Sequence, residues 1–301
     1  MDLRHLRYFV AVAEEGHITR AAERLGIQQP PLSQQIRALE TELDVHLFRR
    51  KPRGVEMTDA GRTLLADARR ILSDVDGALA RARRTARGEQ GRIVVGFTSS
   101  APFHPFVPRA IRRFRELYPR VSLVLEEGGT GDLVAALGAE RLDVAFIRSP
   151  APVSEGIAVH PLLEEPMVAA LPSGHPLAPK SKRKPLPLAG LAAEPFVFYR
   201  RASGPGLHDA IVGACHAAGF TPRTEQEAPR IVSTLNLVAA GLGVTLVPRS
   251  LSDMRLAGVA YRPLAEPPRL TAPIRLACRA VDHSAAARHF VALARRERPK
   301  D

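Results

Sequence analysis

The sequence predicts an α/β fold that is preceded by an N-terminal all-α winged helix-turn-helix and a long linker helix. Three observations lead to this prediction. Apolar residues recur at helical spacing on both sides of Gly26, which is typical of two short helices joined by a turn. A stretch without proline runs from Thr58 to about Arg87, and short apolar strands alternate with helical segments beyond Gly91. We therefore expect three parts, at residues 1–58, 59–90 and 91–301.

The segment ITRAAERLGIQQPPLSQQIRALETEL, residues 18–43, carries the first of these patterns. Its first helix ends at Gly26, and its second opens at Pro30-Pro31, because the first turn of a helix tolerates proline. The apolar side of the second helix must face a core, and it consists of Leu32, Ile36, Leu39 and Leu43. The opposite side is expected to contact a DNA major groove, through Gln29, Pro30, Ser33, Gln34 and Arg37. For this segment alone, a plain helical hairpin with a solvated polar face is the alternative.

A basic turn directly follows the second helix and favours the DNA-binding interpretation. The run from Phe48 to Val55 is flanked by short segments at 45–47 and 55–57, which predicts a two-stranded wing with four cations at its tip. Such a wing can place Arg53 in a minor groove and the other cations on phosphates, namely Arg49, Arg50 and Lys51. The alternative is a solvated charged loop.

The linker helix is expected to begin after Thr58, a good N-cap, with Asp59 in its first turn. Its apolar residues alternate in steps of three and four over three heptads, which is a coiled-coil seam that predicts a partner helix. The alternative is packing on the protein's own core, but the surrounding arginines favour an exposed rod. We expect a dimer contact through Leu65, Leu72, Val75 and Leu79, followed by a hinge at Gly88 and Gly91.

Composition narrows the class of protein. Cys215 and Cys278 are the only two cysteines and lack metal-ligand spacing, so we expect no metal, no cofactor and a reducing cytoplasm. The N-terminus has no signal-peptide pattern. The uncharged run from Ile231 to Pro248 contains polar residues and glycines, so it predicts a buried helix, a turn and a strand rather than a membrane span.

The formal net charge is +12, but most of this excess lies beyond residue 90. The overall charge is therefore weaker support for DNA binding than the local cluster at 49–53. In the C-terminal part, the basic excess favours either an anionic ligand or an ordinary arginine-rich surface. The run KSKRK at 180–184, between prolines, favours an exposed loop.

Beyond Gly91, the pattern predicts strands at 93–97, 121–126, 143–147, 167–171, 196–199, 245–247 and 274–279, and helices at 107–118, 132–141, 207–218, 231–240 and 284–297. Ligands of open α/β sheets bind at the carboxyl ends of strands and near helix N-termini. Hydroxyl and guanidinium groups suited to a carboxylate follow the predicted strands at Ser99, Ser100, Thr130, Arg148 and Arg200. Ser100 also fits a helix N-cap, and Arg148 also fits an ion pair with a neighbouring acid.

Over its whole length, the chain resembles the LysR-type transcriptional regulators. The resemblance is carried by YFVAVAEEGHITRAAERLGIQQPPLSQQIRALETELDVHLFRR, by the wing, by Thr58-Asp59-Ala60-Gly61 and by LVAAGLGVTLVP. It implies a winged helix-turn-helix, a dimerising linker helix and an effector domain of two subdomains like those of periplasmic solute-binding proteins. The subdomains would span about 91–162 with 269–301, and about 163–268. The resemblance also implies tetramers built from dimers, and activation of a nearby gene in response to a small metabolite.

Within this family, IQQPPLSQQI and GFTSSAPFHPFVPRAI resemble the branch that senses benzoate, muconate or chlorocatechol-derived acids. That resemblance implies effector contacts at Ser100, Thr130 and Arg148. The chain departs from the branch at Gln34, where Arg is frequent, and in the loop Arg200–Gly204. This loop either adds cation contacts to an acidic ligand or forms an ordinary exposed turn.

Two other classes of protein compete with a regulator. An enzyme is disfavoured because Gly241-Leu242-Gly243 lacks a third glycine, the histidines are dispersed, and Ser99 and Ser100 have no G-x-S-x-G context. A carrier or solute-binding protein leaves residues 1–87 unexplained. We therefore expect a cytoplasmic DNA-binding regulator that is not an enzyme. Its expected partners are double-stranded promoter DNA, a small organic acid, further copies of itself and, as a candidate, RNA polymerase, with no membrane.

Overall fold

The computed structural model describes residues 1–148, 155–178, 184–200, 206–267, 269–281 and 284–299. The chain forms two compact units, Met1–Arg84 and Thr85–Asp301. Among the residues described, no helix is both long enough and apolar enough to cross a membrane. The predicted loop residues 180–183 and 201–204 lie outside the described residues.

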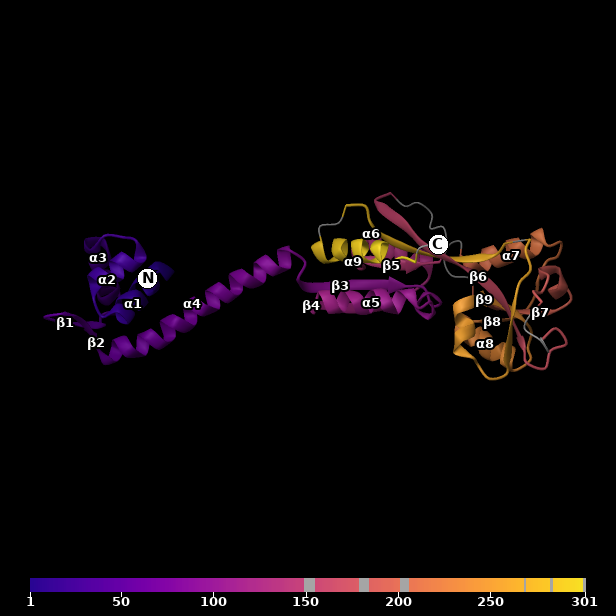
Figure 1. Ribbon diagram of the computed structural model, residues 1–301, viewed down its shortest axis with the longest axis horizontal. Coiled ribbons are helices and arrows are strands. Elements are labelled where there is room, and N and C mark those ends of the chain that lie inside the picture. Colours follow the sequence, from indigo (N-terminus) through magenta and orange to yellow (C-terminus); the bar gives the residue numbers. More distant parts are fainter. Residues whose placement is uncertain (149–154, 179–183, 201–205, 268, 282–283, 300–301) are drawn as a thin grey trace. The chain divides into compact units, whose positions relative to one another are not determined.

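The N-terminal unit is built on three helices, α1 Leu3–Glu15, α2 Ile18–Leu25 and α3 Gln29–Leu43 (Figure 1). They share one core, since Phe9 of α1, Ala21 of α2 and Leu32 of α3 are all fully buried. The helices α2 and α3 confirm the sequence prediction, whereas α1 was not predicted. Its start does have a local signal, because the Asp2 side chain caps it by accepting the N–H of Arg4 at 2.8 Å.

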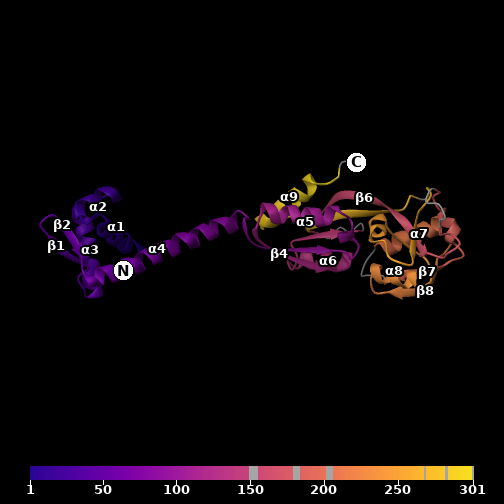
Figure 2. The same ribbon diagram turned by 60° about the horizontal axis from the view of Figure 1, so that its bottom comes forward.

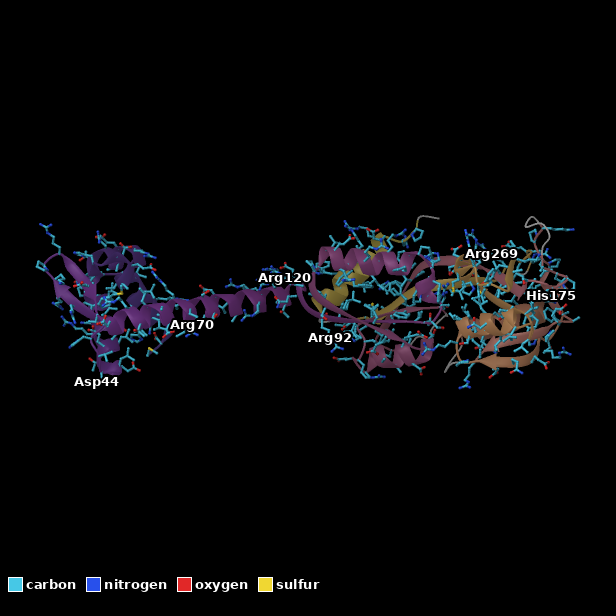
Figure 3. The ribbon with its side chains drawn as sticks, turned by 90° about the horizontal axis from the view of Figure 1, so that it is seen from below. Asp44, Arg70, Arg92, Arg120, His175 and Arg269 are labelled. Carbon is cyan, nitrogen blue, oxygen red and sulfur yellow. The ribbon has the colours of Figure 1, made fainter. Side chains whose placement is uncertain are left out.

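The turn between α2 and α3 begins at a glycine with left-handed backbone angles. Gly26 has φ 65° and ψ 31°, and its N–H donates to the carbonyl oxygens of Ala22 and Glu23 in the last turn of α2. Asp44 ends α3 in the same region, with φ 54° and ψ 37° (Figure 3), which Asp adopts more readily than most residues. The predicted helix-turn-helix is therefore confirmed.

The wing is a hairpin of β1 Phe48–Lys51 and β2 Gly54–Met57. Its first strand was expected at 45–47, but β1 runs through the basic residues, so only residues 52–53 form the tip. Because side chains alternate along a strand, Arg49 and Lys51 lie on one face of the hairpin and Arg50 on the other. The prediction of four cations at the tip is therefore wrong for these three, and only Arg53 lies there.

The long helix α4 Asp59–Ala86 begins after Thr58, whose Oγ1 accepts the N–H of Gly61 at 3.0 Å. The first half of α4 packs on the core of its own unit through partly buried Leu65 and Leu72. For these two residues, the alternative of packing on the protein's own core is the one observed. Farther along, Val75 is half-buried and Leu79 is 49% exposed.

The C-terminal unit contains a sheet with strand order β10-β6-β11-β5-β3-β4, and β9 also pairs with β6. At one end, β3 Gln90–Phe97, β4 Arg120–Glu127 and β5 Val144–Ile147 run parallel. The helices α5 Phe106–Leu117 and α9 Ala285–Arg296 cover one face, and α6 Thr130–Gly138 covers the other (Figure 2). Gly91 lies inside β3, so the hinge prediction is wrong for this residue.

Two long antiparallel strands, β6 Ile157–Pro172 and β11 Thr271–Arg279, continue from the first half of this unit into a second half. There, α7 Leu207–Ala217 packs on one face of β6 and α8 Ile231–Ala239 on the other. The second half also holds β7 Pro195–Tyr199, β8 Arg223–Ala228, β9 Thr245–Pro248 and β10 Val259–Pro263. Short 3₁₀ helices lie at η1 Ala101–Phe103, η2 Leu188–Leu191 and η3 Arg249–Met254. The unit therefore has the two α/β halves that the resemblance implied.

Three strand segments were absent from the predicted elements. The sequence of β8, RTEQEA, is exposed at its first five residues, so it shows no apolar alternation. The strand β10, VAYRP, is short and has no buried residue. The strand predicted at 167–171 is only the second half of β6, which already begins at Ile157. The other predicted strands and helices of this unit are observed, with ends shifted by a few residues.

Candidate functional site

The side of α3 that faces away from the core carries the predicted DNA contacts. Leu32, Ile36 and Leu39 are buried on the core side. On the other side, Ser33 is half-buried, and the exposed residues are Gln29, Pro30, Gln34 and Arg37. This arrangement leaves a helix face rich in amide and guanidinium groups open to a DNA groove.

The wing is attached to α3 by one carboxylate. Glu40 of α3 accepts the N–H of Leu47 at 2.7 Å and the N–H of Phe48 at 3.1 Å, both at Oε1. On the second strand, Val55 donates its N–H to the carbonyl oxygen of Gly16 at 2.9 Å. A Cβ at Gly54 would stand 2.3 Å from that same oxygen, so this position requires glycine. The wing is thus held at a fixed place beside α3.

The four predicted wing cations, Arg49, Arg50, Lys51 and Arg53, are all exposed. Lys51 forms an ion pair of 2.9 Å with Glu56 across the hairpin, and this ammonium group lowers the pKa of the Glu56 carboxyl. Arg53 at the tip is the cation best placed to enter a minor groove, because a narrow groove attracts a protruding guanidinium.

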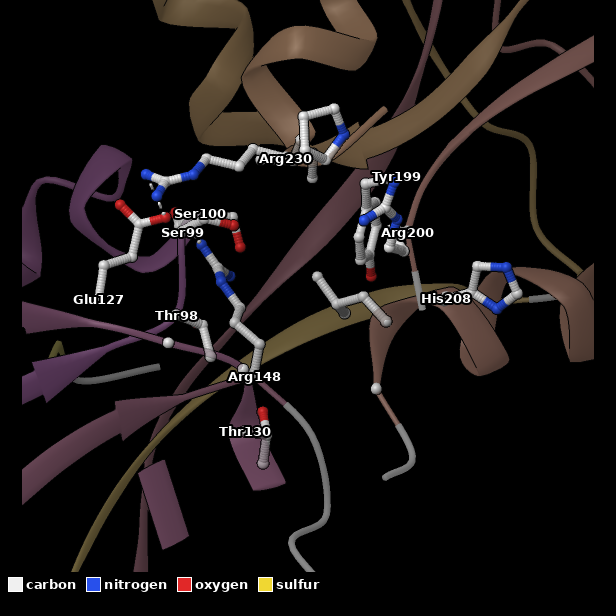
Figure 4. Close-up of a pocket in the computed structure, with 16 residues that line it drawn as sticks. Thr98, Ser99, Ser100, Glu127, Thr130, Arg148, Tyr199, Arg200, His208 and Arg230 are labelled. Carbon is white, nitrogen blue, oxygen red and sulfur yellow. Dashed lines mark hydrogen bonds and ion pairs between the residues drawn. The ribbon is translucent and has the colours of Figure 1, made fainter. Parts of the chain in front are cut away.

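A cavity of about 240 Å³ opens between the two halves of the C-terminal unit (Figure 4). The ends of β3, β4 and β5 line it from one half, and the end of β7 with the starts of α7 and α8 line it from the other. All five residues predicted for an effector line this cavity: Ser99, Ser100, Thr130, Arg148 and Arg200. The structure therefore brings together side chains that are up to 101 positions apart in the sequence.

Arg148 is already engaged by the protein. Its side chain is 2% exposed. Its Nη1 lies 2.5 Å from Oε1 of Glu165 and donates to the carbonyl oxygen of Ala272 at 3.1 Å, while Nη2 donates to that of Ser100 at 3.0 Å. The alternative role of Arg148 as the partner of an acid is thus observed, and the acid is Glu165 of β6.

Three residues on the cavity lining each have a buried polar atom without a hydrogen-bond partner among the described residues. These atoms are Nε of Arg148, Oγ1 of Thr98 and Nδ1 of His208. A buried donor without a partner is costly, so a ligand that bonds these atoms would recover that cost. Ser100 stands at the N-cap of η1, but its side chain makes no capping bond.

Burial changes the acidity of the groups around the cavity. It lowers the pKa of the Arg148 guanidinium, an effect that the Glu165 carboxylate opposes. Burial likewise raises the pKa of the Tyr199 phenol above its usual range, so this lining residue carries its proton at neutral pH. His104 lines another pocket together with Glu165, and burial lowers the pKa of its imidazole. These shifts favour the uncharged forms of the Tyr199 phenol and the His104 imidazole at neutral pH.

Three helix N-termini converge on the cavity. The lining includes Thr130, the first residue of α6, then Gly206 and Leu207 at the start of α7, and Arg230 and Ile231 at the start of α8. Free N–H groups and the helix dipole make such termini favourable for an anion. Neither α6 nor α8 has a side-chain cap, so these N–H groups are available.

Several lining residues were missed by reasoning from the sequence, namely Thr98, Glu127, Tyr199, His208 and Arg230. Thr98, Glu127 and Tyr199 do follow the pattern of residues at strand ends, which is the signal that could have found them. Arg230 and His208 lie at helix starts, and only the fold brings them to the cavity. Among the described residues there is no cluster of His, Cys, Asp and Glu fit to hold a metal ion.

Both units match known protein families. Residues 86–299 match the LysR substrate binding domain, and residues 3–62 match the bacterial regulatory helix-turn-helix protein of the lysR family. The uncharacterized HTH-type transcriptional regulator YnfL of Escherichia coli (strain K12) is 45% identical over 266 residues, covering 88% of each chain. The HTH-type transcriptional regulator BudR of Raoultella terrigena is 41% identical over 291 residues, covering 97% of this chain and 99% of BudR.

A solved structure extends the likeness to the fold of the whole chain. The crystal structure of full-length CbnR complexed with its target DNA has a TM-score of 0.84 to this chain at 30% identity, and it covers 99% of this chain and 100% of CbnR. The fold and the matched families thus define a DNA-binding transcription regulator with an effector-binding domain, not an enzyme. The chain belongs to the LysR family of transcriptional regulators.

Proposed function

We propose that this regulator grips promoter half-sites with its winged helix-turn-helix, and that a small, carboxylate-bearing metabolite in the cavity controls how it bends DNA and activates transcription. These roles divide the chain as proposed from the sequence, into 1–58 for DNA, 59–90 for linkage and 91–301 for the effector.

The DNA contacts proposed for α3 are Gln29, Pro30, Ser33, Gln34 and Arg37, and those for the wing are Arg49, Arg50, Lys51 and Arg53. Exposure of all but half-buried Ser33 supports this proposal. The side chains of α3 suit base edges, whereas the cations of the wing suit phosphates and sequence-independent affinity. Because side chains alternate along β1, Arg49 and Lys51 would contact DNA from one face of the hairpin and Arg50 from the other.

The observation that carries the effector proposal is the meeting of three helix N-termini, serine and threonine hydroxyls and three guanidinium groups around one cavity. Each of these groups favours an anion, and a carboxylate can accept several such bonds at once. We assign the effector contacts to Ser99, Ser100, Thr130, Arg148 and Arg200. Both Nη atoms of Arg148 already bond to other parts of the protein. Its proposed role is therefore to donate the N–H at Nε to the effector and to fix the position of the residues that it bonds.

Self-association is proposed through the second half of α4, where Leu79 is exposed and Val75 is half-buried. Leu65 and Leu72 pack on the core of the N-terminal unit and would hold α4 in position for this contact. Two helix-turn-helix units one DNA turn apart match a two-fold site. Pairs of such dimers would form the tetramer, and RNA polymerase is the proposed partner in activation.

The ligand acts by its difference in affinity for two arrangements of the assembly. It contacts both halves of the C-terminal unit, because the cavity lining comes from both. We propose that the bound acid changes the angle between these halves, and that the assembled regulator then bends its DNA less or differently without leaving it.

Calorimetric titration of the full chain with a panel of small organic acids tests the effector site. We expect one class of acid to bind, and Thr130→Val to weaken that binding by about tenfold, the loss of roughly one hydrogen bond to a charged group. Thr224→Val is the matched control, because Thr224 is exposed on β8 and does not line the cavity. Equal binding by the wild type and Thr130→Val would remove Thr130 from the site.

A further inference from the structure

An ion pair bridges the mouth of the cavity from one half of the C-terminal unit to the other. Glu127 is the last residue of β4, and Arg230 is the N-cap residue of α8. Nη1 of Arg230 lies 3.0 Å from Oε1 of Glu127 (Figure 4), with side chains 64% and 32% exposed. Both residues line the cavity, so any ligand meets this pair.

The charges around the cavity nearly cancel. Arg148 is paired with Glu165, and Arg230 is paired with Glu127. Arg200 is exposed, and no ion pair of its side chain is found within the described part of the chain. The guanidinium and carboxylate groups described here therefore leave one excess positive charge, although three guanidinium groups line the cavity.

We propose that Glu127 sets the charge of the effector, so that the site accepts a monocarboxylate and rejects a dicarboxylate. This inference rests on the proposed function and names the ligand class of the same site. A single carboxylate balances the excess charge beside Arg200. A second carboxylate, reaching for Arg230, meets the carboxylate of Glu127 at the same place, and like charges brought together at a binding surface oppose association.

The size of the cavity agrees with a small acid. A volume of about 240 Å³ holds roughly eight water-sized groups at about 30 Å³ each. Acids of three to eight carbons are therefore suitable probes, and pairs of similar size that differ by one carboxylate isolate the effect of charge. Three such pairs are propionate with malonate, butyrate with succinate, and 2-methylbenzoate with phthalate, and in each pair a carboxylate replaces a methyl group.

The pair can be altered without unfolding the chain. Solvent-exposed ion pairs contribute little to stability because water and salt screen them. Glu127→Gln keeps the shape of the side chain and removes its charge, so the cavity gains a second excess positive charge. Glu126→Gln is the matched control, since Glu126 is the exposed neighbour on the same strand and does not line the cavity.

Two further variants complete a charge series. Arg230→Gln leaves Glu127 unpaired and removes the excess positive charge, so monocarboxylate binding should weaken. The double variant Glu127→Gln with Arg230→Gln returns the cavity to one excess positive charge. It should again prefer the monocarboxylate, as the wild type does. A role of these residues in shape alone would not produce this reversal.

The test is calorimetric titration of the full chain and these four variants with the three acid pairs. For the wild type and Glu126→Gln, we expect the monocarboxylate of a pair to bind more tightly than its dicarboxylate. For Glu127→Gln, we expect the ratio of the two dissociation constants to shift toward the dicarboxylate by about tenfold or more.

An unchanged ratio in Glu127→Gln, or a wild type that prefers dicarboxylates, would overturn the inference while leaving a carboxylate effector in place. If none of the six acids binds any variant, although all variants bind DNA, both the inference and the proposed carboxylate effector fail.

Discussion

Arg148 and Glu165 form a buried ion pair, with Nη1 and Oε1 2.5 Å apart and both side chains at most 6% exposed. Glu165 also accepts the N–H and the hydroxyl of Ser250 in η3 at 2.8 and 3.1 Å. Together with the bonds of Arg148 to Ala272 and Ser100, the pair ties β5, β6, β11, η1 and η3 to one point. The pair adjoins the cavity that we assign to the effector, because Arg148 is one of its lining residues.

Removing one partner of this pair should destabilise the C-terminal unit. Glu165→Ala leaves a buried guanidinium without its carboxylate, which costs about 3–5 kcal/mol. We expect a corresponding fall in the free energy of unfolding, measured by urea denaturation. Glu164→Ala is the control, because Glu164 is the exposed neighbour on the same strand. A loss below about 1 kcal/mol for Glu165→Ala, the range of exposed pairs, would show that the pair is not a structural tie.

The attachment of the wing to α3 predicts a second effect. Glu40→Ala leaves the N–H groups of Leu47 and Phe48 without their acceptor, which costs about 1–3 kcal/mol. Hydrogen exchange of these two amides should accelerate, and DNA affinity should fall because the wing is no longer fixed beside α3. Glu23→Ala, at an exposed site on α2, should change neither. Unaltered exchange at both amides would contradict the role of Glu40.

The two DNA-contacting elements should respond differently to substitution. Arg53→Ala removes the guanidinium at the wing tip, so it should weaken binding to all sequences and flatten the salt slope by roughly one unit, as for one lost phosphate contact. Gln34→Ala should alter base preference with little change in that slope. Fluorescence anisotropy over a series of salt concentrations, with operator and unrelated DNA, measures both. A salt slope that Arg53→Ala leaves intact would count against the wing.

Stability should fall as the pH drops below the usual pKa of histidine. Burial holds the pKa of His104, and also that of His160, below 6.5 in the folded chain. The unfolded chain therefore takes up protons first as the pH falls, so the stability present above about pH 6.5 is lost as the pH falls toward the folded pKa. His104→Gln should make the free energy of unfolding less dependent on pH between about 7.5 and 5.5.

The exposed His46 supplies the control for this pH series. His46→Gln should leave the pH dependence of the wild type unchanged. A pH dependence that is identical in the wild type and His104→Gln would assign the effect to other groups.

Local patterns were sufficient to predict much of this fold. The helices α2 and α3 follow from apolar spacing within 26 residues, and their separating turn follows from a glycine that adopts positive φ. The start of α4 follows from the hydroxyl of Thr58, which makes the expected capping bond. Strands buried on both faces, such as β5, also show clearly in the sequence because every residue is apolar.

Features that depend on distant parts of the chain were not predictable. The exposed strand β8 has no apolar alternation, and parallel pairing with β7 makes it a strand. The first half of α4 packs on its own unit because α1 supplies a core there, and α1 was not among the predicted helices. The five predicted effector residues do meet at one cavity, but Glu127 and Arg230 pair across 103 positions, a relation that only the fold reveals.

The central claim is that an acid in the cavity changes how this regulator holds DNA, and a footprint tests it most directly. The measurement is protection of the DNA just upstream of the protein's own gene, with and without small aromatic and aliphatic acids. We predict a protected region that shortens, or a bend that relaxes, with an acid that binds the cavity, and no such change in Thr130→Val. An identical footprint with and without an acid that calorimetry shows to be bound would contradict the account.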